Sequence, residues 1–267
     1  MDPIAIYFTG TAGVGKTTLT TAFQDWMRDS GYEAVTVNLD PGMEDPAFDP
    51  DVDIRDWVNL RDIMAENKLG PNGAQVAASD MVALKIAEVK NALESLRSEY
   101  ILIDTPGQVE LFAFRESSRT IVEELSGDRS MIAFLFDPML TRHPHGLVSL
   151  FMLSATTQFR FRLPMMNILA KDDLLNDLER DRIRSWTEEP QSLYDAVARD
   201  ETEREGVVSL EFFKALENVG PLWSLISTSA SEERGMEDIY SAVQEAFAGG
   251  EDLEASDDED DEPSKQE

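Results

Sequence analysis

The sequence predicts an α/β protein built on a doubly wound, mainly parallel sheet, and two observations carry this prediction. Short apolar runs alternate along the chain with longer amphipathic segments, which is the order of strand, helix and strand in such folds. Most of the runs are almost continuously apolar, as expected for parallel strands that helices cover on both faces. Each crossover between parallel neighbours is then expected to be right-handed.

The elements follow from these runs in chain order. Strands are expected at 4–9, 34–39, 100–104, 131–137, 165–170 and 222–227, and the first, third, fourth and fifth are the nearly continuous apolar runs. Helical periodicity lies between them, at 16–30, 79–98, 110–125, 145–161 and 236–248. Together they form one expected domain, residues 1–248. Residues 174–217 are charged with a helical pattern, and we expect a helical insertion or lid there, between two late strands.

The composition excludes several classes of protein. The chain has 267 residues, of which 42% are hydrophobic, so it can bury a sizeable core. It has no cysteine, which excludes disulfides, cysteine-based metal sites and thiol catalysis. The longest unbroken apolar run, 131–136, is too short to cross a bilayer, and the sequence does not open with a secretory leader pattern. We therefore expect a cytoplasmic protein without a membrane segment.

Acidic residues dominate the charge. The chain has 53 Asp and Glu against 23 Lys and Arg, a formal net charge of −30. Residues 249–267 form an acidic tail that we expect to be disordered, but most of the excess is spread over the preceding body. Such a surface repels itself at ordinary ionic strength and is screened at molar salt, which favours adaptation to a salt-rich cytoplasm. An acidic surface that docks on a basic partner is the alternative, and direct nucleic-acid binding is disfavoured in both cases.

A phosphate-binding motif lies between the first expected strand and the first expected helix. The run Gly10-Thr-Ala-Gly-Val-Gly-Lys16-Thr17 matches the pattern G-x-x-x-x-G-K-[ST]. In this pattern backbone N–H groups surround the phosphates, Lys16 reaches the β- and γ-phosphates, and the Thr17 hydroxyl binds Mg²⁺. The residues expected to contact the nucleotide are Ala12, Gly13, Val14, Gly15, Lys16, Thr17 and Thr18. A glycine-rich turn without a ligand is the alternative.

A second motif, Asp104-Thr-Pro-Gly107, directly follows the third expected strand. Ligands bind along the carboxyl edge of open α/β sheets, so this motif is expected beside the phosphates. Asp104 can hold Mg²⁺ there through water, and the Gly107 N–H can meet the γ-phosphate. A simple Pro-Gly turn describes the same residues without excluding that role.

A third motif, Ala170-Lys171-Asp172-Asp173, follows the fifth expected strand and fits the guanine-reading pattern [NT]-K-x-D. Asp173 would accept hydrogen bonds from the N1–H and the exocyclic amine of guanine, whereas adenine has no N1–H. Lys171 would pack on the base or the neighbouring loop. Ala170 departs from the pattern, because alanine cannot brace the loop as Asn or Thr would. After the last strand, Ser229-Ala230 supplies the small-residue loop expected to cover the base.

Two further runs narrow the family. Asn38-Leu-Asp40-Pro41 closes the second expected strand, where Asp40 can meet the Mg²⁺ shell or the attacking water, and Gly70-Pro71-Asn72 lies between two helical segments. Together with Asp104-Thr-Pro-Gly-Gln108-Val-Glu110, these runs resemble the GPN-loop GTPases, from about residue 4 to residue 247.

This resemblance implies a Mg²⁺-dependent GTPase, with GTP as substrate and GDP as product, on the P-loop NTPase fold of the signal-recognition and MinD-like class. It implies a homodimer in which the Gly70-Pro71-Asn72 loop reaches the site of the other subunit, so that Asn72 acts near the γ-phosphate in trans. Gln108, Glu110 and Asp40 would orient the attacking water. A protein client, with hydrolysis timing an assembly event, fits the same resemblance. An ATPase or nucleotide kinase on the same P-loop is the alternative that the residues leave open.

Overall fold

A seven-stranded sheet forms the centre of the computed structural model, which describes residues 3–43, 49–125, 127, 129–199, 213 and 224–248. The strands are β1 Ile4–Gly10, β2 Ala34–Asn38, β3 Val52–Asp53, β4 Tyr100–Asp104, β5 Ser130–Phe136, β6 Met165–Leu169 and β7 Leu225–Ser227. Their order across the sheet is β3-β2-β4-β1-β5-β6-β7, and every described pair is parallel. The predicted fold class is confirmed, and β1 lies in the middle of the sheet.

Six of these strands were predicted, with ends that differ by a residue or a few, whereas β3 was not. β3 has only two residues, which is too short for any periodicity to stand out in the sequence. It pairs with the end of β2 through Val37 and Asn38, so its place depends on the sheet that is already there.

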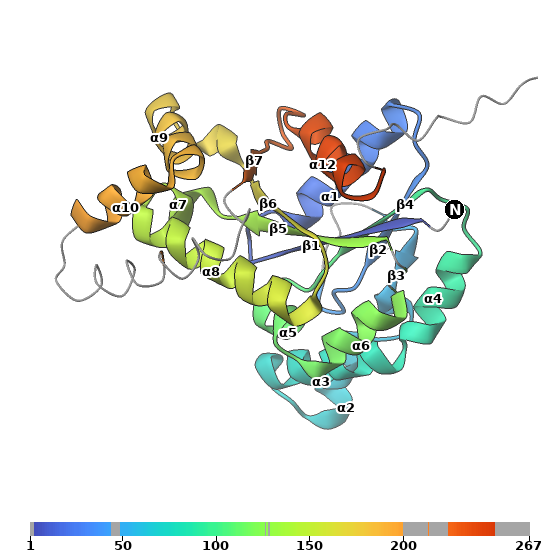
Figure 1. Ribbon diagram of the computed structural model, residues 1–267. Coiled ribbons are helices and arrows are strands. Elements are labelled where there is room, and N and C mark those ends of the chain that lie inside the picture. The colour runs from blue at the N-terminus through green and yellow to red at the C-terminus, as the bar shows by residue number, and fades with distance from the viewer. Residues whose placement is uncertain are drawn as a thin grey trace, which may run out of the picture.

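Helices connect the strands and lie on both sides of the sheet (Figure 1). The α-helices are α1 Lys16–Asp29, α2 Leu60–Asn67, α3 Pro71–Leu84, α4 Ile86–Glu94, α5 Val109–Ala113, α6 Glu116–Leu125, α7 Pro138–Thr141, α8 Pro144–Phe161, α9 Asp177–Glu188, α10 Pro190–Arg199 and α12 Met236–Ala248. Two short 3₁₀ turns are η1 Ile54–Asp56 and η2 Asp172–Leu174. None of the helices in the described residues is long and apolar enough to span a membrane.

Two of the predicted helices are each divided in the structure. The segment predicted at 79–98 begins earlier, at Pro71, and is interrupted at Lys85, whose backbone leaves the helical region with φ −105° and ψ 4°. The segment predicted at 110–125 is interrupted between Ala113 and Glu116, where the chain turns from α5 into α6. Periodicity spans both breaks because the two halves of each segment bury apolar residues against the same face of the sheet.

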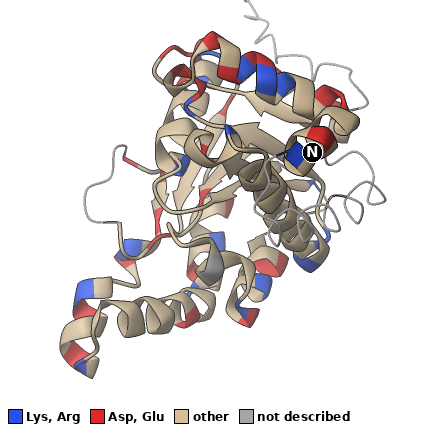
Figure 2. Cartoon of the chain, turned by 90° about the vertical axis from the view of Figure 1, so that its left-hand side faces the viewer, with Lys and Arg blue, Asp and Glu red and all other residues tan. Residues whose placement is uncertain are grey.

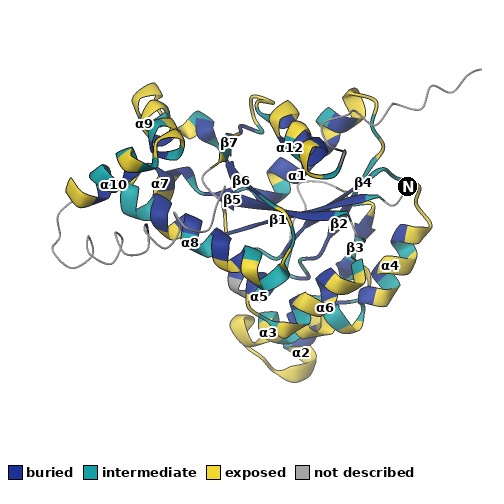
Figure 3. Cartoon of the chain, in the orientation of Figure 1, coloured by how far each residue is buried: buried dark blue, intermediate teal, exposed yellow. Residues whose placement is uncertain are grey.

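The core has two layers, one on each face of the sheet. Alternate residues of β1 divide between them: Ile4, Ile6 and Phe8 pack with α1 and α12, whereas Ala5 and Tyr7 pack on the opposite side. That opposite layer includes residues of α3, α4, α5, α6 and α8. The central strands β1, β4 and β5 are consequently buried throughout (Figure 3), whereas no residue of β7 is fully buried. Charged residues are concentrated on helices and loops (Figure 2).

Parts of the predicted domain organisation lie outside the described residues. Helices α9 and α10 follow β6 within the predicted insertion 174–217, but 200–212 and 214–217 are not described. The predicted acidic tail, 249–267, is also outside the described residues. The single domain with an insertion and a tail therefore stays a prediction.

Parallel pairing brings the candidate residues to one edge. Since β2, β4, β1, β6 and β7 all run in the same direction, their carboxyl ends lie along the same side of the sheet. At these ends or within two residues after them lie Asp40, Asp104, the Gly10–Thr17 loop, Lys171 and Ser229. A ligand at this edge would meet all five segments.

Candidate functional site

The loop after β1 places Lys16 inside its own curve. Gly15 caps α1 with φ 107°, and an added Cβ would lie 2.9 Å from Lys171 Cε, so a glycine is required there. Lys16 is buried, and its Nζ donates to the carbonyls of Gly10 (3.0 Å), Thr11 (3.0 Å) and Gly107 (3.2 Å). Burial lowers the pKa of Lys16, and the nearby carboxylates of Asp104 and Asp40 oppose that shift. The Lys16 ammonium is therefore poorly hydrated, and it can exchange its carbonyl partners for phosphate oxygens.

Asp104 and Thr17 fit a divalent cation. The Thr17 hydroxyl donates to Asp104 Oδ2 at 2.5 Å, and the Asp104 side chain is almost completely buried. Burial raises the pKa of Asp104 to about 7, although the Thr17 hydrogen bond and Lys16 both act to lower it. Its Oδ1 has no hydrogen-bond partner among the described residues. A buried carboxylate oxygen without a partner, beside a hydroxyl, is the kind of oxygen ligand that Mg²⁺ takes.

The protein alone offers few further ligands at this point. Among the described residues, no group of three or more His, Cys, Asp and Glu side chains is arranged to hold a metal ion. A Mg²⁺ ion held by Asp104 and Thr17 would need phosphate and water oxygens to complete its shell, which is usual for Mg²⁺ at nucleotides. The donor set fits a metal that binds together with a nucleotide.

Asp40 joins the loop after β2 to the loop after β4. Its Oδ2 accepts from the Gly107 N–H at 3.1 Å, and its Oδ1 accepts from the Gly42 N–H at 2.8 Å. Asn38 holds the Asp40 backbone from both sides, accepting from its N–H at 2.9 Å and donating to its carbonyl at 3.2 Å. The Gly107 N–H, predicted to meet a γ-phosphate, is thus bonded to a carboxylate in this structure.

The predicted base-reading residues gather at the ends of β6 and β7. Lys171 lies across the phosphate loop and donates to the Gly13 carbonyl at 2.7 Å, while Asp173 Oδ1 accepts from the Ser229 hydroxyl at 2.7 Å. Beside them is a small, mostly apolar pocket of about 210 Å³. It is lined by Gly15, Thr18, Leu19, Ala170, Lys171, Asp173, Leu174, Thr228, Ala230 and Ser231. A flat heterocycle with polar edges suits such a pocket.

Three residues at this edge were not predicted from the sequence. Asn38 clamps Asp40, and its spacing two residues before the aspartate was the one signal available. Asp172 is buried and forms an ion pair with Arg234, with 2.6 Å between Oδ1 and Nη2. Burial raises the pKa of Asp172, and Arg234 and Arg180 oppose the shift. The third position of the [NT]-K-x-D pattern carries no residue preference, so the pattern could not indicate a role for Asp172.

The other predicted catalytic residues lie at the start of α3 and at or beside α5. Asn72 is exposed in the first turn of α3, a helix that packs against α2, α5 and α6. The predicted loop Gly70-Pro71-Asn72 is instead the start of that helix, with Gly70 as N-cap and Pro71 in the first turn. Gln108 is exposed just before α5, and Glu110 lies within α5, although its side chain is outside the described part of the structure.

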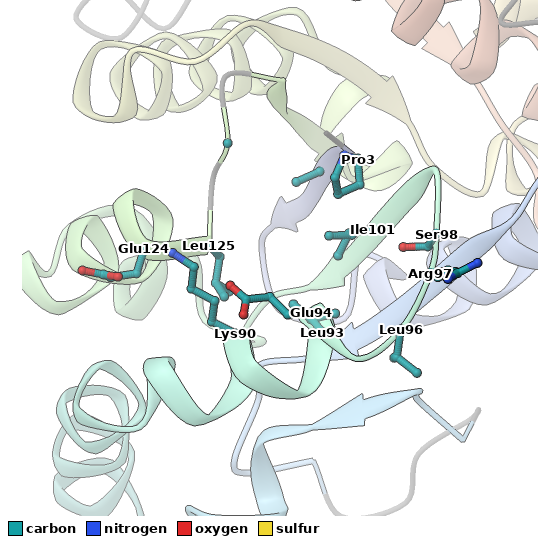
Figure 4. A pocket seen from close by; sticks show the side chains of 12 residues that line it. Pro3, Lys90, Leu93, Glu94, Leu96, Arg97, Ser98, Ile101, Glu124 and Leu125 are labelled. Carbon is teal, nitrogen blue, oxygen red and sulfur yellow. The ribbon is translucent and has the colours of Figure 1, made fainter. Parts of the chain in front are cut away.

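Figure 4 shows a larger hollow, which none of the residues of this cluster lines. It has a volume of about 560 Å³ and begins at Pro3, Ala5 and Ile101, near the amino ends of β1 and β4. The cations among its lining residues, Lys90 and Arg97, are matched by two acids, Glu94 and Glu124. It offers no net positive charge to a phosphate, so size alone does not identify the nucleotide site.

Comparison with known proteins identifies a family, its relatives and a solved structure. The family described as "Conserved hypothetical ATP binding protein" matches residues 8–249. The GPN-loop GTPase PAB0955 of Pyrococcus abyssi is 31% identical over 91% of this chain and 96% of its own length. Its crystal structure, described as a GTPase in apo form, superposes with a TM-score of 0.82 at 30% identity, covering 91% of this chain and 97% of that one.

A eukaryotic relative is more distant and longer. GPN-loop GTPase 1 of Dictyostelium discoideum is 29% identical over 91% of this chain but only 61% of its own length. The chain therefore spans about three fifths of that protein. The family description and the relatives differ in the nucleotide that they name, ATP in one and GTP in the others.

Proposed function

Because this chain belongs to the GPN-loop GTPase family, we propose that it binds GTP and hydrolyses it to GDP and phosphate. The observation that carries the choice of GTP over ATP is the position of Asp173. Its carboxylate lines the small pocket beside Gly15 and Lys171, held by the Ser229 hydroxyl. A carboxylate matches the N1–H and amine of guanine and faces an acceptor, N1, when adenine binds.

Each protein group then has a distinct role toward the triphosphate. Lys16 exchanges its carbonyl partners for β- and γ-phosphate oxygens, and the N–H groups of the Gly10–Thr17 loop surround them. Asp104 and Thr17, which are hydrogen-bonded to one another, would hold the metal. Mg²⁺, when bound, neutralises charge that develops on the phosphate oxygens. Asp40, Gln108 and Glu110 orient the attacking water, and the Gly107 N–H leaves Asp40 for the γ-phosphate.

Base selectivity tests this proposal. We expect the wild type to bind GDP about 100-fold or more tightly than ADP, since the wrong base leaves a carboxylate facing an acceptor. Asp173→Asn should reduce that ratio sharply, measured by isothermal titration calorimetry with both nucleotides. Asp181→Asn removes the same charge from an exposed position on α9 and should leave the ratio unchanged. Equal affinity of the wild type for GDP and ADP would overturn the guanine assignment and favour an ATPase or nucleotide kinase.

We also propose that the active form is a homodimer in which Asn72 serves the partner's site. Asn72 is exposed, and the turn from α2 into α3 that carries it is among the most exposed parts of the molecule (Figure 3). Helix α3 has a single charged residue, Asp80, and the neighbouring apolar side chains Val76 and Leu84 are also exposed. In a chain of net charge −30, a nearly uncharged outer helix face supports contact with a second protein surface.

A second region, which has basic but no acidic residues, supports a further protein contact. No Asp or Glu occurs between Asp137 and Asp172, and Met139, Leu140 and Phe159 are exposed within that stretch. We assign this region to a protein client or to the dimer itself, in keeping with a switch or assembly factor whose hydrolysis times a protein–protein event. We attribute the excess of acidic residues on the remaining surface to adaptation to a salt-rich cytoplasm.

A further inference from the structure

The conformation of the loop after β7 is restrained by backbone hydrogen bonds and a glycine. It is closed by an antiparallel bridge in which the Ser229 N–H donates to the Arg234 carbonyl at 3.1 Å and the Arg234 N–H donates to the Ser229 carbonyl at 2.9 Å. Gly235 follows with φ 83°, and a Cβ added there would lie 2.3 Å from the Ser227 carbonyl oxygen. The bridge and the glycine therefore determine which way the side chains of Ser229 and Arg234 point.

The two residues of this bridge hold two successive aspartates of the loop after β6. Ser229 Oγ donates to Asp173 Oδ1 at 2.7 Å, and Arg234 Nη2 donates to Asp172 Oδ1 at 2.6 Å. The backbones are joined as well, since the Asp172 N–H donates to the Thr228 carbonyl at 3.0 Å. The side chain expected to read the base thus lies next to a residue whose carboxylate is tied to the opposite loop.

The hydrogen bonds and the ion pair of Asp172 hold the loop after β6 in place of the side-chain hydrogen bonds that Asn or Thr would make at position 170. Ala170 has no side-chain hydrogen bond to offer, although its methyl group packs in the core and its backbone N–H donates to the Phe136 carbonyl at 3.1 Å. The Asp172 side chain is 3% exposed. Arg180 Nε donates to the backbone carbonyl of Asp172 at 3.1 Å. A carboxylate this buried needs a cationic partner, and Arg234 supplies it while remaining 42% exposed itself.

We propose that Arg234 is a positioning residue for guanine recognition: through its ion pair with Asp172 it holds the loop after β7 against the loop after β6, so that Asp173 faces the base. This rests on the proposed function, since it takes Asp173 as the guanine reader. Arg234 itself is not proposed to contact the base. It acts through Asp172, and its loss leaves the phosphate-binding groups around Lys16 unaltered, because other residues hold them.

The ratio of GDP to ADP affinity distinguishes a role of Arg234 in positioning Asp173 from a role in overall stability. In Arg234→Gln the Asp172 carboxylate keeps its burial and its interaction with Arg180 but loses its ion pair with Arg234, so the two loops are no longer joined by that pair. We expect GDP affinity to fall about tenfold or more while ADP affinity changes less than about twofold, with kcat for GTP at saturation within about threefold of wild type. Arg234→Lys keeps a cation and should recover most of the GDP affinity.

Two further variants control for charge and folding. Arg184→Gln makes the same charge change on α9, at an arginine that is 66% exposed and pairs with Asp181, and should leave both affinities unchanged. Asp172→Asn removes the buried charge itself, so it stays folded if Arg234→Gln does not, and it should show the same selective loss of GDP affinity. Calorimetry with GDP and ADP, together with thermal unfolding of each variant, measures all of these quantities.

The outcomes distinguish this inference from the proposed function. A wild type that does not discriminate GDP from ADP contradicts the guanine assignment. A wild type that does discriminate, with selectivity unchanged in Arg234→Gln and Asp172→Asn, contradicts the role of Arg234 alone. Equal losses for GDP and ADP would mean that the pair supports the whole site rather than base reading, which also overturns the inference.

Discussion

Asp104 illustrates how function and stability oppose one another in a single side chain. Its carboxylate is almost fully buried, its pKa is raised to about 7 by that burial, and one of its oxygens has no partner among the described residues. Such a group lowers the stability of the protein without ligand. The proposed cation-binding role would explain why a carboxylate occupies this position.

Asp104→Asn is therefore expected to separate the two effects. Removing the desolvated charge should raise the unfolding temperature without nucleotide at pH 8, while Mg²⁺-dependent hydrolysis falls about 100-fold or more. Differential scanning fluorimetry and a phosphate-release assay over a Mg²⁺ titration measure the two results. Chelation of metal by EDTA should reduce wild-type hydrolysis to the level of the variant. Wild-type rates in Asp104→Asn would remove this carboxylate from the metal site.

Asn72→Ala should lower the hydrolysis rate much more than it weakens GDP binding, because a contact made in the transition state is measured in kcat. Asn67→Ala changes another exposed asparagine, at the end of α2, and serves as the control. Steady-state hydrolysis and GDP titration measure the two quantities. An unchanged kcat in Asn72→Ala would exclude this residue from the mechanism.

Mixing variants tests whether Asn72 acts across the dimer. In hybrids of Lys16→Ala with excess Asn72→Ala protein, the subunit with an intact phosphate loop receives an intact Asn72 from its partner. We expect activity to recover in part, in proportion to the hybrids counted by native mass spectrometry. Hybrids that form without recovery of activity would argue against the arrangement in trans.

Helices α7 and α8 meet at a glycine. A Cβ added to Gly146 would lie 2.2 Å from the Leu140 carbonyl oxygen, whereas Gly73, also the third residue of its helix, has no neighbour closer than 3.7 Å. We expect Gly146→Ala to lower the free energy of unfolding by about 1–3 kcal/mol. Gly73→Ala should be neutral or stabilising, because alanine favours the helix. Urea unfolding followed by circular dichroism gives both values, and equal values would mean that the two helices do not approach this closely.

The molecule as a whole carries most of its charge on helices and loops (Figure 2), and the charged residues within the described strands are Asp53 and Asp104, at the ends of β3 and β4. If the acidic surface reflects a salt-rich environment, screening should stabilise the fold. We expect the unfolding temperature to rise by at least about 5 °C between 0.1 M and 3 M KCl. Sorbitol at matched osmolality serves as the uncharged control. An unfolding temperature independent of KCl would favour the alternative, a surface that docks on a basic partner.

The sequence by itself determined the fold class and most of the candidate site. Continuous apolar runs such as 131–136 predict buried parallel strands, and the short motifs after these runs must then meet at one edge. Local patterns are sufficient to predict these features. A strand buried on both faces appears as consecutive apolar residues, and a phosphate-binding turn appears as closely spaced glycines. The sequence alone thus predicts that residues as distant as Asp40, Asp104 and Asp173 lie along one edge of the sheet.

Only the tertiary structure decided the contacts between segments far apart in the chain. The ion pair of Asp172 with Arg234 spans 62 positions, and the bond of Asp40 to the Gly107 N–H spans 67. The two-residue strand β3 and the break at Lys85 depend in the same way on neighbours already in place. A pattern in sequence records which residues are buried or turned. Which partner a buried polar group finds depends on how the loops pack in three dimensions, and that is why Asp172 and Arg234 emerged only from the folded chain.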